Sequence, residues 1–598
     1  MTVMAEPVPD AEVADVRTTA GAGPLLRVEN LHTYFGDPKR PEKALKAVDG
    51  VSWQIDRGET FCCVGESGSG KSISALSIMG LVPKPPGFHP GGAIHLAGEN
   101  GGPPIDLMKV GERGLRDIRG RRIGMIFQEP MSSLNPVYTI GDQIGEVLKL
   151  HMGMNGREAR ARTIDLLKQV QIRDAESTVD EYPHRFSGGM RQRVMIAMAM
   201  ACEPDLLIAD EPTTALDVTI QAEILRLIKE LQDRKGMSVL FITHDFDVVA
   251  EIADHVAVMR YGKIVESGTK DEVLRKAEHP YTQELLAALP RNLKAKRDAE
   301  RSRVAAEPVV GVVEAEVSER VHVDHAVANP PDTVLKVKDL RVWFPVKKGL
   351  LGRTVDHVKA VDDVSFELPR RQILAVVGES GSGKTTLGRA ILQLIPPTKG
   401  SVNFEGRELV GMGSGELRRM RRDMQIVFQD PFSSLNPRMT IGSMLTEIMN
   451  VHGIGHGKSE QQDMAADLMK RVELQPEMLR RYPHEFSGGQ RQRIGIARAL
   501  VPNPRFIVCD EVTSALDVSV QARLLQLLLD LRDQLGLTYL FITHNLGVVE
   551  YLADETLVMY KGKIAERGPT EQVVNDPQDE YTKKLLAAVP RMDPTIAA

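Results

Sequence analysis

The chain has only four cysteines among its 598 residues: Cys62, Cys63, Cys202 and Cys509. None belongs to a C-x-x-C pair, and all four lie in apolar runs. This spacing excludes the usual zinc-binding and iron–sulfur ligand patterns. We therefore expect buried, reduced thiols, as in a cytosolic protein.

Long hydrophobic runs and an excess of basic charge are also lacking. No run of 18 or more apolar residues occurs, so no segment is predicted to span a bilayer. The N-terminus shows no basic segment followed by an apolar one, which argues against a secretory signal. There are 75 Lys and Arg against 81 Asp and Glu, a formal net charge of −6. This balance gives no basic footprint for nucleic acid.

Aromatic residues are absent from two long stretches. Residues 1–24 are rich in Ala, Pro and acidic residues, which predicts a disordered N-terminal tail. Residues 291–334 begin basic, turn acidic and contain several prolines, which predicts a flexible linker between domains. A short C-terminal tail is expected over 591–598.

What the chain does have is a long internal repeat. The string GESGSGK occurs at Gly65–Lys71 and again at Gly378–Lys384, 313 residues later. Three further motifs, built around FSGG, DE-x-T-x-ALDV and FITH, recur with a spacing of 300 residues. A period this long indicates duplication of a whole domain, so we predict domains at 25–290 and 335–590. The first copy has about a dozen extra residues, which we place in the Gly- and Pro-rich stretch Pro83–Pro104.

The repeated GESGSGK string predicts a phosphate-binding loop in each copy. In G-x-x-x-x-G-K-[ST], backbone N–H groups surround phosphate oxygens, the Lys reaches the β- and γ-phosphates, and the hydroxyl binds Mg²⁺. The predicted nucleotide-binding residues of these loops are Gly65, Glu66, Ser67, Gly68, Ser69, Gly70, Lys71 and Ser72, with Gly378, Glu379, Ser380, Gly381, Ser382, Gly383, Lys384 and Thr385.

The pattern around each loop predicts an α/β fold. Thr60–Gly65 and Ile373–Gly378 are short apolar runs of the kind found in buried parallel strands, and helical spacing follows each loop. Two further apolar runs in each copy end in acids or in a His, at the strand ends where α/β sheets place ligands. The segments at about 129–200 and 430–500 turn helical and polar, which predicts a helical subdomain in each copy.

The charged residues at the strand ends are candidates for catalysis. A carboxylate after four apolar residues, as at Asp210 and Asp510, is costly to bury unless a cation such as Mg²⁺ is near; the alternative is a capping Asp. Glu211 and Glu511 would be general bases for an attacking water, or else solvated surface residues. His244 and His544 would donate a hydrogen bond to the γ-phosphate, or else be core histidines.

The repeated SGG turn predicts a second anion site in each copy. Its glycines let the backbone approach an anion closely, and its Ser caps the helix that follows. By itself the motif is only an N-cap signal. One explanation is that each turn closes over the nucleotide that the other copy holds. The residues concerned are Ser187, Gly188, Gly189, Ser487, Gly488 and Gly489.

Together these motifs resemble those of the ATP-binding-cassette (ABC) ATPases. FSGGM and FSGGQ look like variants of that family's LSGGQ signature, and Ala215–Asp217 and Ala515–Asp517 match its D-loop. The resemblance implies two tandem P-loop NTPase (RecA-like) cores, each with an antiparallel β subdomain and a helical subdomain. It also implies that Gln128 and Gln429 are Q-loop glutamines, which take part in catalysis and bind Mg²⁺, and that His244 and His544 are switch histidines. The aromatic that stacks on adenine would be Phe35 in the first copy and Phe344 in the second, with the adjacent Tyr34 and Trp343 as alternatives.

The family mechanism implies a head-to-tail pair of cassettes with two ATP molecules and Mg²⁺ at their interface. Lys71 would then face Ser487–Gly489, and Lys384 would face Ser187–Gly189. Both sites retain the Lys, Asp, Glu, His and Gln, so we predict two active sites. The departures from the pattern are Met190, which replaces the last Gln of the signature, and Val512, which replaces the Pro at position 212.

Two further strings narrow the resemblance. EHPYTQELLAALPR at Glu278–Arg291 and DEYTKKLLAAVPR at Asp579–Arg591 follow the two copies, and SSLNP follows each Q-loop. They resemble ATPases of the oligopeptide/dipeptide/nickel importers, which implies two permease subunits, an external binding protein and a location on the cytoplasmic membrane face through those permeases. Many relatives carry a Cys cluster near the YTxxLL segment. Residues 279–334 and 581–598 have no Cys, so we predict no Fe–S cluster.

One alternative function remains open at this level. Tandem cassettes without membrane spans also occur in translation factors that act on the ribosome, usually with a charged helical linker and basic patches. The linker here is mixed in composition and the net charge is negative, which favours the importer. The cargo is not encoded in these motifs: peptides are the first expectation, with nickel, glutathione-like and other substrates left open.

Overall fold

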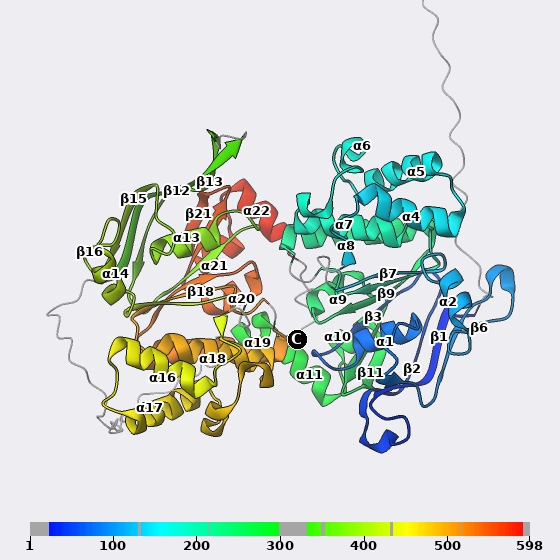
Figure 1. The fold of residues 1–598 in the computed structure, drawn as a ribbon, viewed down its shortest axis with the longest axis horizontal. Coiled ribbons are helices and arrows are strands. Elements are labelled where there is room, and N and C mark those ends of the chain that lie inside the picture. The colour runs from blue at the N-terminus through cyan, green and yellow to red at the C-terminus, as the bar shows by residue number, and fades with distance from the viewer. Residues whose placement is uncertain are drawn as a thin grey trace, which may run out of the picture.

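The computed structural model describes residues 23–128, 133–213, 216–297, 332–348, 353–430, 434–514 and 516–589. We refer to residues 23–297 as the first half and to residues 332–589 as the second half. The halves lie side by side, each built from sheets and covering helices (Figure 1). The expected disorder of residues 1–22, of most of the linker and of the C-terminal tail concerns segments outside the described residues.

Each half has a six-stranded sheet at its centre. In the first half the strand order is β11-β10-β3-β9-β8-β7, and β3, β7, β8, β9 and β10 run parallel while β11 is antiparallel. The innermost strands are buried throughout and apolar, as a sheet covered on both faces requires. The strands are β3 Thr60–Val64, β7 Ile123–Ile126, β8 Leu206–Asp210, β9 Ser238–Thr243, β10 His255–Arg260 and β11 Lys263–Thr269.

The second half repeats this topology. Its order is β17-β18-β19-β14-β20-β21, again parallel except for the last strand. The parallel sheet predicted from the apolar runs is therefore present twice. The strands are β14 Ile373–Val377, β17 Met424–Val427, β18 Phe506–Asp510, β19 Thr538–Ile542, β20 Glu555–Tyr560 and β21 Lys563–Pro569.

A smaller antiparallel sheet accompanies each central sheet. It consists of β1 Leu26–Phe35, β2 Leu45–Ile55, β4 Gly87–Phe88, β5 Ala93–Leu96 and β6 Ile105–Asp106 in the first half, and of β12 Thr333–Lys348, β13 Arg353–Pro369, β15 Lys399–Phe404 and β16 Arg407–Glu408 in the second. Strand β4 and the short helix η2 (Glu99–Gly101) have no counterpart in the described residues of the second half. Both lie in Pro83–Pro104, the stretch where the extra residues were expected.

A helical layer follows β7 or β17, the strand at one edge of the six-stranded sheet in each half. Its helices are α4 Ile140–Met152, α5 Gly156–Gln169, α6 Ala175–Thr178 and α7 Gly188–Ala199, and α16 Ile441–His452, α17 Lys458–Arg471 and α18 Gly488–Leu500. Their apolar faces join one continuous core with the central sheet of the same half. The segments whose sequence is polar and helical thus form an outer layer of helices, and each half's layer is held to the central sheet by the apolar faces of these helices.

The remaining helices flank the central sheets. They are α1 Lys71–Ile78, α2 Glu112–Ile118, α8 Val218–Lys235, α9 Phe246–Ile252, α10 Lys270–Arg275 and α11 Pro280–Ala287 in the first half, and α13 Lys384–Ile391, α14 Ser414–Met420, α19 Val518–Leu535, α20 Leu546–Leu552, α21 Thr570–Asn575 and α22 Glu580–Ala587 in the second. Short 3-10 turns are η1 Pro41–Lys43, η3 Pro183–Arg185, η4 Pro476–Arg480 and η5 Pro483–Glu485. Within the described ranges, no helix has both the length and the apolar character of a membrane span.

The two halves face in opposite directions. Helices α4 and α5 lie at one end of the molecule, and α16 and α17 lie at the opposite end (Figure 1). Helix α11 of the first half contacts α19 of the second, and Leu293 packs against the core of the second half. The arrangement is therefore head to tail, and the motifs of one half meet those of the other at the centre.

Candidate functional site

Each GESGSGK string forms a tight loop between a central strand and a helix. In the first half the loop connects β3 to α1, and Gly65, Gly68 and Gly70 have φ angles of 146°, 80° and 107°. A Cβ at Gly65 would lie 2.3 Å from the carbonyl oxygen of Met259, so only glycine fits there. The corresponding glycines of the second half have φ angles of 146°, 80° and 107° as well. The strand–loop–helix context expected of a phosphate-binding loop is present in both halves.

The lysine of each loop reaches back over its own loop. The Lys71 ammonium donates hydrogen bonds to the carbonyl oxygens of Gly65 at 2.7 Å and Glu66 at 2.9 Å. Lys384 makes the same contacts to Gly378 at 2.6 Å and Glu379 at 3.0 Å. Burial lowers the pKa of Lys384. A poorly hydrated ammonium above a cradle of N–H groups favours an anionic ligand such as a phosphate.

A hydroxyl and a carboxylate meet beside each loop. The Ser72 hydroxyl donates to Asp210 Oδ1 at 2.9 Å, and Thr385 donates to Asp510 Oδ1 at 2.9 Å. Burial and the nearby charge of Glu211 raise the pKa of Asp210 to about 6, although the hydrogen bond from Ser72 acts to lower it. A carboxylate that is poorly solvated gains from a divalent cation, and all the polar atoms here are oxygens. These residues therefore fit Mg²⁺.

The acid after each Asp points to a different pair of partners. Gln128 Nε2 donates to Glu211 Oε2 at 2.9 Å, and His244 Nδ1 lies 3.4 Å from Glu211 Oε1. Glu211 has a φ angle of 46°, which bends the chain at the strand end and separates its side chain from that of Asp210. The two adjacent carboxylates therefore have different partners.

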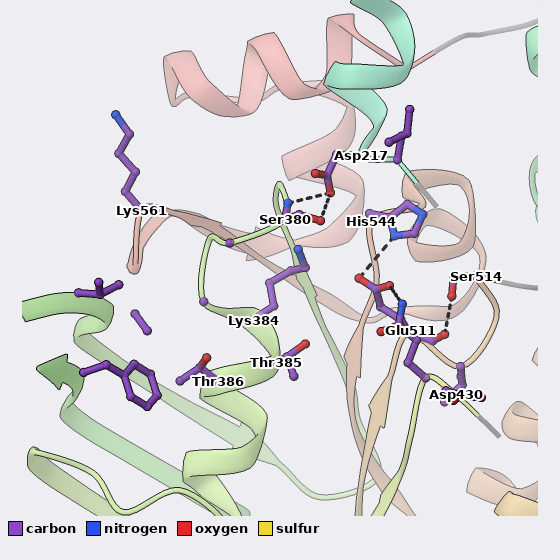
Figure 2. A pocket seen from close by; sticks show the side chains of 18 of the residues that line it. Asp217, Ser380, Lys384, Thr385, Thr386, Asp430, Glu511, Ser514, His544 and Lys561 are labelled. Atoms are coloured by element: carbon purple, nitrogen blue, oxygen red, sulfur yellow. Dashed lines mark hydrogen bonds and ion pairs between the residues drawn. The ribbon is translucent and has the colours of Figure 1, made fainter. Parts of the chain in front are cut away.

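The second half repeats this arrangement around Glu511. Gln429 Nε2 donates to Glu511 Oε2 at 2.6 Å, and His544 Nδ1 lies 3.5 Å from Glu511 Oε1 (Figure 2). Burial alone would raise the pKa of Glu511, but the hydrogen bond from His544 and the charge of Lys384 bring it below its usual value. The carboxyl is thus held in its charged, proton-accepting form.

A large cavity opens around the phosphate-binding loop of the second half. Its volume is about 940 Å³, which is within the range of nucleotide-sized ligand pockets. Phe344 and Val358 line its apolar side and Lys384, Glu511 and His544 its polar side. Figure 2 shows the labelled polar residues converging on this space.

The neighbouring aromatics Tyr34 and Trp343 each have a polar partner, and the stacking of Phe35 and Phe344 on adenine stays a prediction. Phe344 is 42% exposed and lines the cavity. Tyr34 is buried and its hydroxyl donates to Asp49 at 2.5 Å, and the Trp343 indole N–H donates to Asp362 at 3.2 Å. Their polar tips are thus bound within the antiparallel sheet.

Two residues that sequence reasoning left out of the site connect the halves. Asp217 Oδ1 accepts hydrogen bonds from the backbone N–H and the hydroxyl of Ser380, in the loop of the opposite half. Asp517 does the same for Ser67 at 2.8 and 3.0 Å. Their recurrence in ALDV was noted, but only the fold shows that they lie against the other half's loop.

Among the residues that the structure describes, no hydrogen bond joins an SGG turn to the phosphate-binding loop of the opposite half. Ser187 caps α7, accepting a hydrogen bond from the Met190 N–H at 3.3 Å, and the turn is not part of the lining around Lys384. That lining instead includes Gly488 of the same half. A Cβ at Gly489 would lie 2.3 Å from Val520, so this glycine also serves the packing of α18 on α19. The facing of each turn and the opposite lysine remains a prediction.

Comparison with known proteins is consistent with this geometry. The family model described as ABC transporter matches residues 48–214 and 361–514, and the model described as oligopeptide/dipeptide transporter, C-terminal region, matches residues 265–310 and 565–597. The chain is 46% identical to the glutathione import ATP-binding protein GsiA of Pectobacterium atrosepticum over 99% of its length and 92% of that protein's.

Two further relatives are similar along their whole length. GsiA of Escherichia coli strain K12 is 47% identical over 96% of this chain and 91% of its own. The peptidoglycan transport ATP-binding protein YejF of Agrobacterium fabrum is 48% identical over 94% of this chain and 96% of its own. The chain therefore belongs to the ABC transporter family, as an ATPase that fuses two cassettes of the oligopeptide/dipeptide importer group.

Proposed function

We propose that this chain hydrolyses ATP at two interfacial sites to drive a membrane importer for peptides or peptide-like molecules. The observation that carries the proposal is the pair of contacts from Asp217 to Ser380 and from Asp517 to Ser67. Each phosphate-binding loop is touched by the other half, so binding or loss of nucleotide at a loop acts on the interface.

The catalytic roles follow from the contacts at each site. Glu211 accepts the proton of the attacking water, because its carboxylate oxygens are held by Gln128 and His244 in the orientation that the structure shows. Lys71 leaves its carbonyl partners and binds phosphate oxygens. Glu511, Gln429, His544 and Lys384 do the same in the second half.

Mg²⁺ would be held by Ser72 and Asp210 in the first half and by Thr385 and Asp510 in the second. Gln128 and Gln429 would each supply an amide oxygen. When bound, Mg²⁺ would neutralise charge on the phosphates. The protein's own contribution to catalysis is largely positioning and charge stabilisation of an in-line water.

Closure of the halves would bring the SGG turns over the nucleotides. Ser187 and Ser487 each cap a helix whose N-terminal N–H groups favour an anion. The two halves belong to one chain, so the linker keeps their local concentration high and makes pairing intramolecular. ATP would hold the halves together, and hydrolysis would release them.

The partners would be two permease subunits and an extracytoplasmic binding protein, with the chain on the cytoplasmic face of the membrane. Support comes from two exposed apolar side chains in the segment that follows the Q-loop of the first half: Val137, just before α4, is 71% exposed and Leu150, near the end of α4, is 72% exposed. Exposed apolar side chains of this kind can contribute to a protein contact. Membrane contact would be through these permeases.

A transport experiment tests this proposal. Uptake of radiolabelled glutathione, a dipeptide, an oligopeptide and Ni²⁺ is measured in a strain that lacks the gene. Wild-type chain should restore uptake of at least one peptide-type substrate, and Glu211→Gln with Glu511→Gln should not. Restoration of Ni²⁺ uptake alone would contradict the peptide assignment.

The same strains distinguish the ribosomal alternative. An affinity-tagged chain should co-purify with hydrophobic permeases from detergent-solubilised membranes. Co-sedimentation with ribosomes, together with unchanged uptake of every substrate in the deletion strain, would overturn the importer proposal.

A further inference from the structure

Four hydrogen bonds link Glu66, the second residue of the first phosphate-binding loop, to side chains of other residues. Its carbonyl accepts from Lys71 at 2.9 Å, and its N–H donates to the Tyr281 hydroxyl oxygen at 3.4 Å. The Tyr281 hydroxyl in turn donates to Glu66 Oε2 at 3.2 Å. Glu66 Oε1 accepts a hydrogen bond from the Ser519 hydroxyl of the opposite half. One loop residue thus joins Lys71, helix α11 of the same half and helix α19 of the other half.

Tyr281 is well fixed for this role. It lies on α11, is 2% exposed, and has the Arg260 guanidinium 4.2 Å from the centre of its ring. Burial raises its pKa, so the hydroxyl stays protonated and can donate and accept at once. Helix α11 also contacts α19, which carries Ser519. The three segments therefore converge on Glu66 from different parts of the chain.

The second half has only part of this arrangement. The Tyr581 hydroxyl accepts a hydrogen bond from the Glu379 N–H at 3.1 Å, and the Glu379 carbonyl accepts from Lys384 at 3.0 Å. At the position of Ser519 the first half has Thr219. A cavity of about 730 Å³, lined by Thr219, Glu379 and Tyr581 among others, lies at the place that corresponds to the hydrogen bond between Ser519 and Glu66. Between the described residues Thr219 and Glu379, the structure shows no hydrogen bond.

We propose that Tyr281 and Tyr581 are positioning residues for the phosphate-binding loops, and that the chain Tyr281–Glu66–Ser519 couples nucleotide affinity at the first site to contact between the halves. The hydroxyl of each tyrosine fixes the loop backbone next to the residue whose carbonyl holds the lysine. In the first half the fixed carboxylate also carries the link to α19. The second site is positioned by its tyrosine but is not linked in this way.

The test is equilibrium binding of Mg–ADP to full-length protein with one site disabled. In a Lys384→Ala background only the first site binds, and in a Lys71→Ala background only the second. Tyr281→Phe keeps the ring and removes only the hydroxyl, so it should raise the first site's Kd roughly three- to tenfold, as loss of one or two hydrogen bonds does. Tyr581→Phe should do the same at the second site.

The cross-half link is tested by matched variants. Ser519→Ala and Glu66→Gln should each raise the first site's Kd about two- to fivefold, whereas Thr219→Ala, the matched change at the start of α8, should change the second site's Kd by less than about 1.5-fold. Tyr281→Phe combined with Ser519→Ala should raise the Kd by less than the product of the single effects, because both act through one carboxylate.

The controls make each outcome decisive. The melting temperature of each variant, measured without nucleotide, should equal that of the single-site parent protein. A merely structural role would lower the melting temperature and leave the Kd the same as in that parent. An unchanged Kd in Tyr281→Phe overturns the positioning role. Equal effects of Ser519→Ala and Thr219→Ala, or a multiplicative double variant, overturn the asymmetric link. The inference rests on nucleotide binding and not on cargo, so a failure of peptide uptake would leave it intact.

Discussion

Asp217 of the first half and Ser380 of the second are joined by two hydrogen bonds, at 2.7 Å to the backbone N–H and 2.8 Å to the hydroxyl. The acceptor is a carboxylate oxygen that lies against a phosphate-binding loop, and Figure 2 shows it entering the cavity from the other half. The same relationship holds in reverse for Asp517 and Ser67. Each phosphate-binding loop is therefore held from across the interface by a carboxylate of the other half.

The first prediction concerns these carboxylates. Replacing both by Ala, Asp217→Ala with Asp517→Ala, should lower ATP hydrolysis roughly fivefold or more, because hydrogen bonds to charged groups contribute about 1.5–3 kcal/mol each. Binding of Mg–ADP to a single loop should change less than twofold or so, since the loop keeps its own N–H groups. Steady-state hydrolysis and calorimetric ADP binding measure the two effects. Full hydrolysis in the double variant would contradict a coupling role.

The second prediction concerns the general base. Glu211→Gln combined with Glu511→Gln should reduce hydrolysis by about a hundredfold or more, the usual contribution of a positioned acid–base group. ATP should remain bound, and the closed form should accumulate, as detected by retention of labelled ATP on gel filtration. The matched control is Glu230→Gln on α8, where the partly exposed carboxylate forms a surface ion pair with Arg226 at 3.0 Å. Normal turnover in the double variant would refute the assignment.

The third prediction concerns the Mg²⁺ site. Ser72→Ala removes the hydroxyl that contacts Asp210, so the Mg²⁺ concentration for half-maximal hydrolysis should rise roughly tenfold. Ser72→Thr is the control, because the second half has Thr385 at the same place and it makes the same 2.9 Å contact. The measurement is made in a Lys384→Ala background, where only the first site binds nucleotide. An unchanged Mg²⁺ dependence in Ser72→Ala would contradict the assignment of the Ser72 hydroxyl to the Mg²⁺ site.

The fourth prediction concerns the thiols. Burial raises the pKa of Cys63 to about 12 and raises the pKa values of Cys62, Cys202 and Cys509 as well. Native protein at pH 8 should therefore react with a thiol reagent far more slowly than denatured protein. In the unfolded chain these thiols ionise near pH 8.5. Above that pH the unfolded state has lost protons that the folded state keeps, so each fully buried thiol lowers the free energy of unfolding by up to about 1.4 kcal/mol per pH unit.

Rapid reaction of the native protein would show that these thiols are accessible. Stopped-flow labelling, with the guanidinium-denatured chain as the reference, measures it. The stability effect is checked by the melting temperature between pH 8 and 10, which should fall as pH rises.

The fifth prediction concerns iron. The residues matched by the oligopeptide/dipeptide C-terminal model, 265–310 and 565–597, contain no Cys. Protein purified without added metal should therefore contain far less than one iron and one acid-labile sulfide per chain. Stoichiometric iron and sulfide in a chemical assay would show that ligands outside those segments form a cluster.

Much of the site could be predicted from the sequence because its parts are local. The glycines of Gly65–Gly70 are needed by backbone angles within one loop, and the acids follow their strands directly. Apolar runs of four residues with an acid at the tip imply buried strands and a charged sheet edge, without reference to the rest of the chain. The central sheet and the phosphate-binding loops follow from such patterns.

Contacts between the halves could not be predicted residue by residue. Asp217 and Asp517 recur in the sequence, but their spacing of hundreds of residues from Ser380 and Ser67 gives no signal of contact. Tyr281 appeared only as part of a recurring string, and its bond to Glu66 depends on how α11 folds back on the central sheet. Which of the adjacent aromatics Trp343 and Phe344 has a polar partner inside the sheet also depends on the fold.

The sequence by itself determined that there are two copies of one phosphate-binding unit, and which residues of each unit carry charge to the edge of its sheet. These are consequences of short-range sterics and of the cost of burying charge, which act within a few residues. Only the tertiary structure decided which half touches which loop and that the first site alone is linked through Glu66 to Ser519. Such contacts depend on how whole helices pack across an interface. Ser519 and Thr219 both carry a hydroxyl at the same position of the repeat, but only the Ser519 hydroxyl is seen to bond to a loop carboxylate of the opposite half.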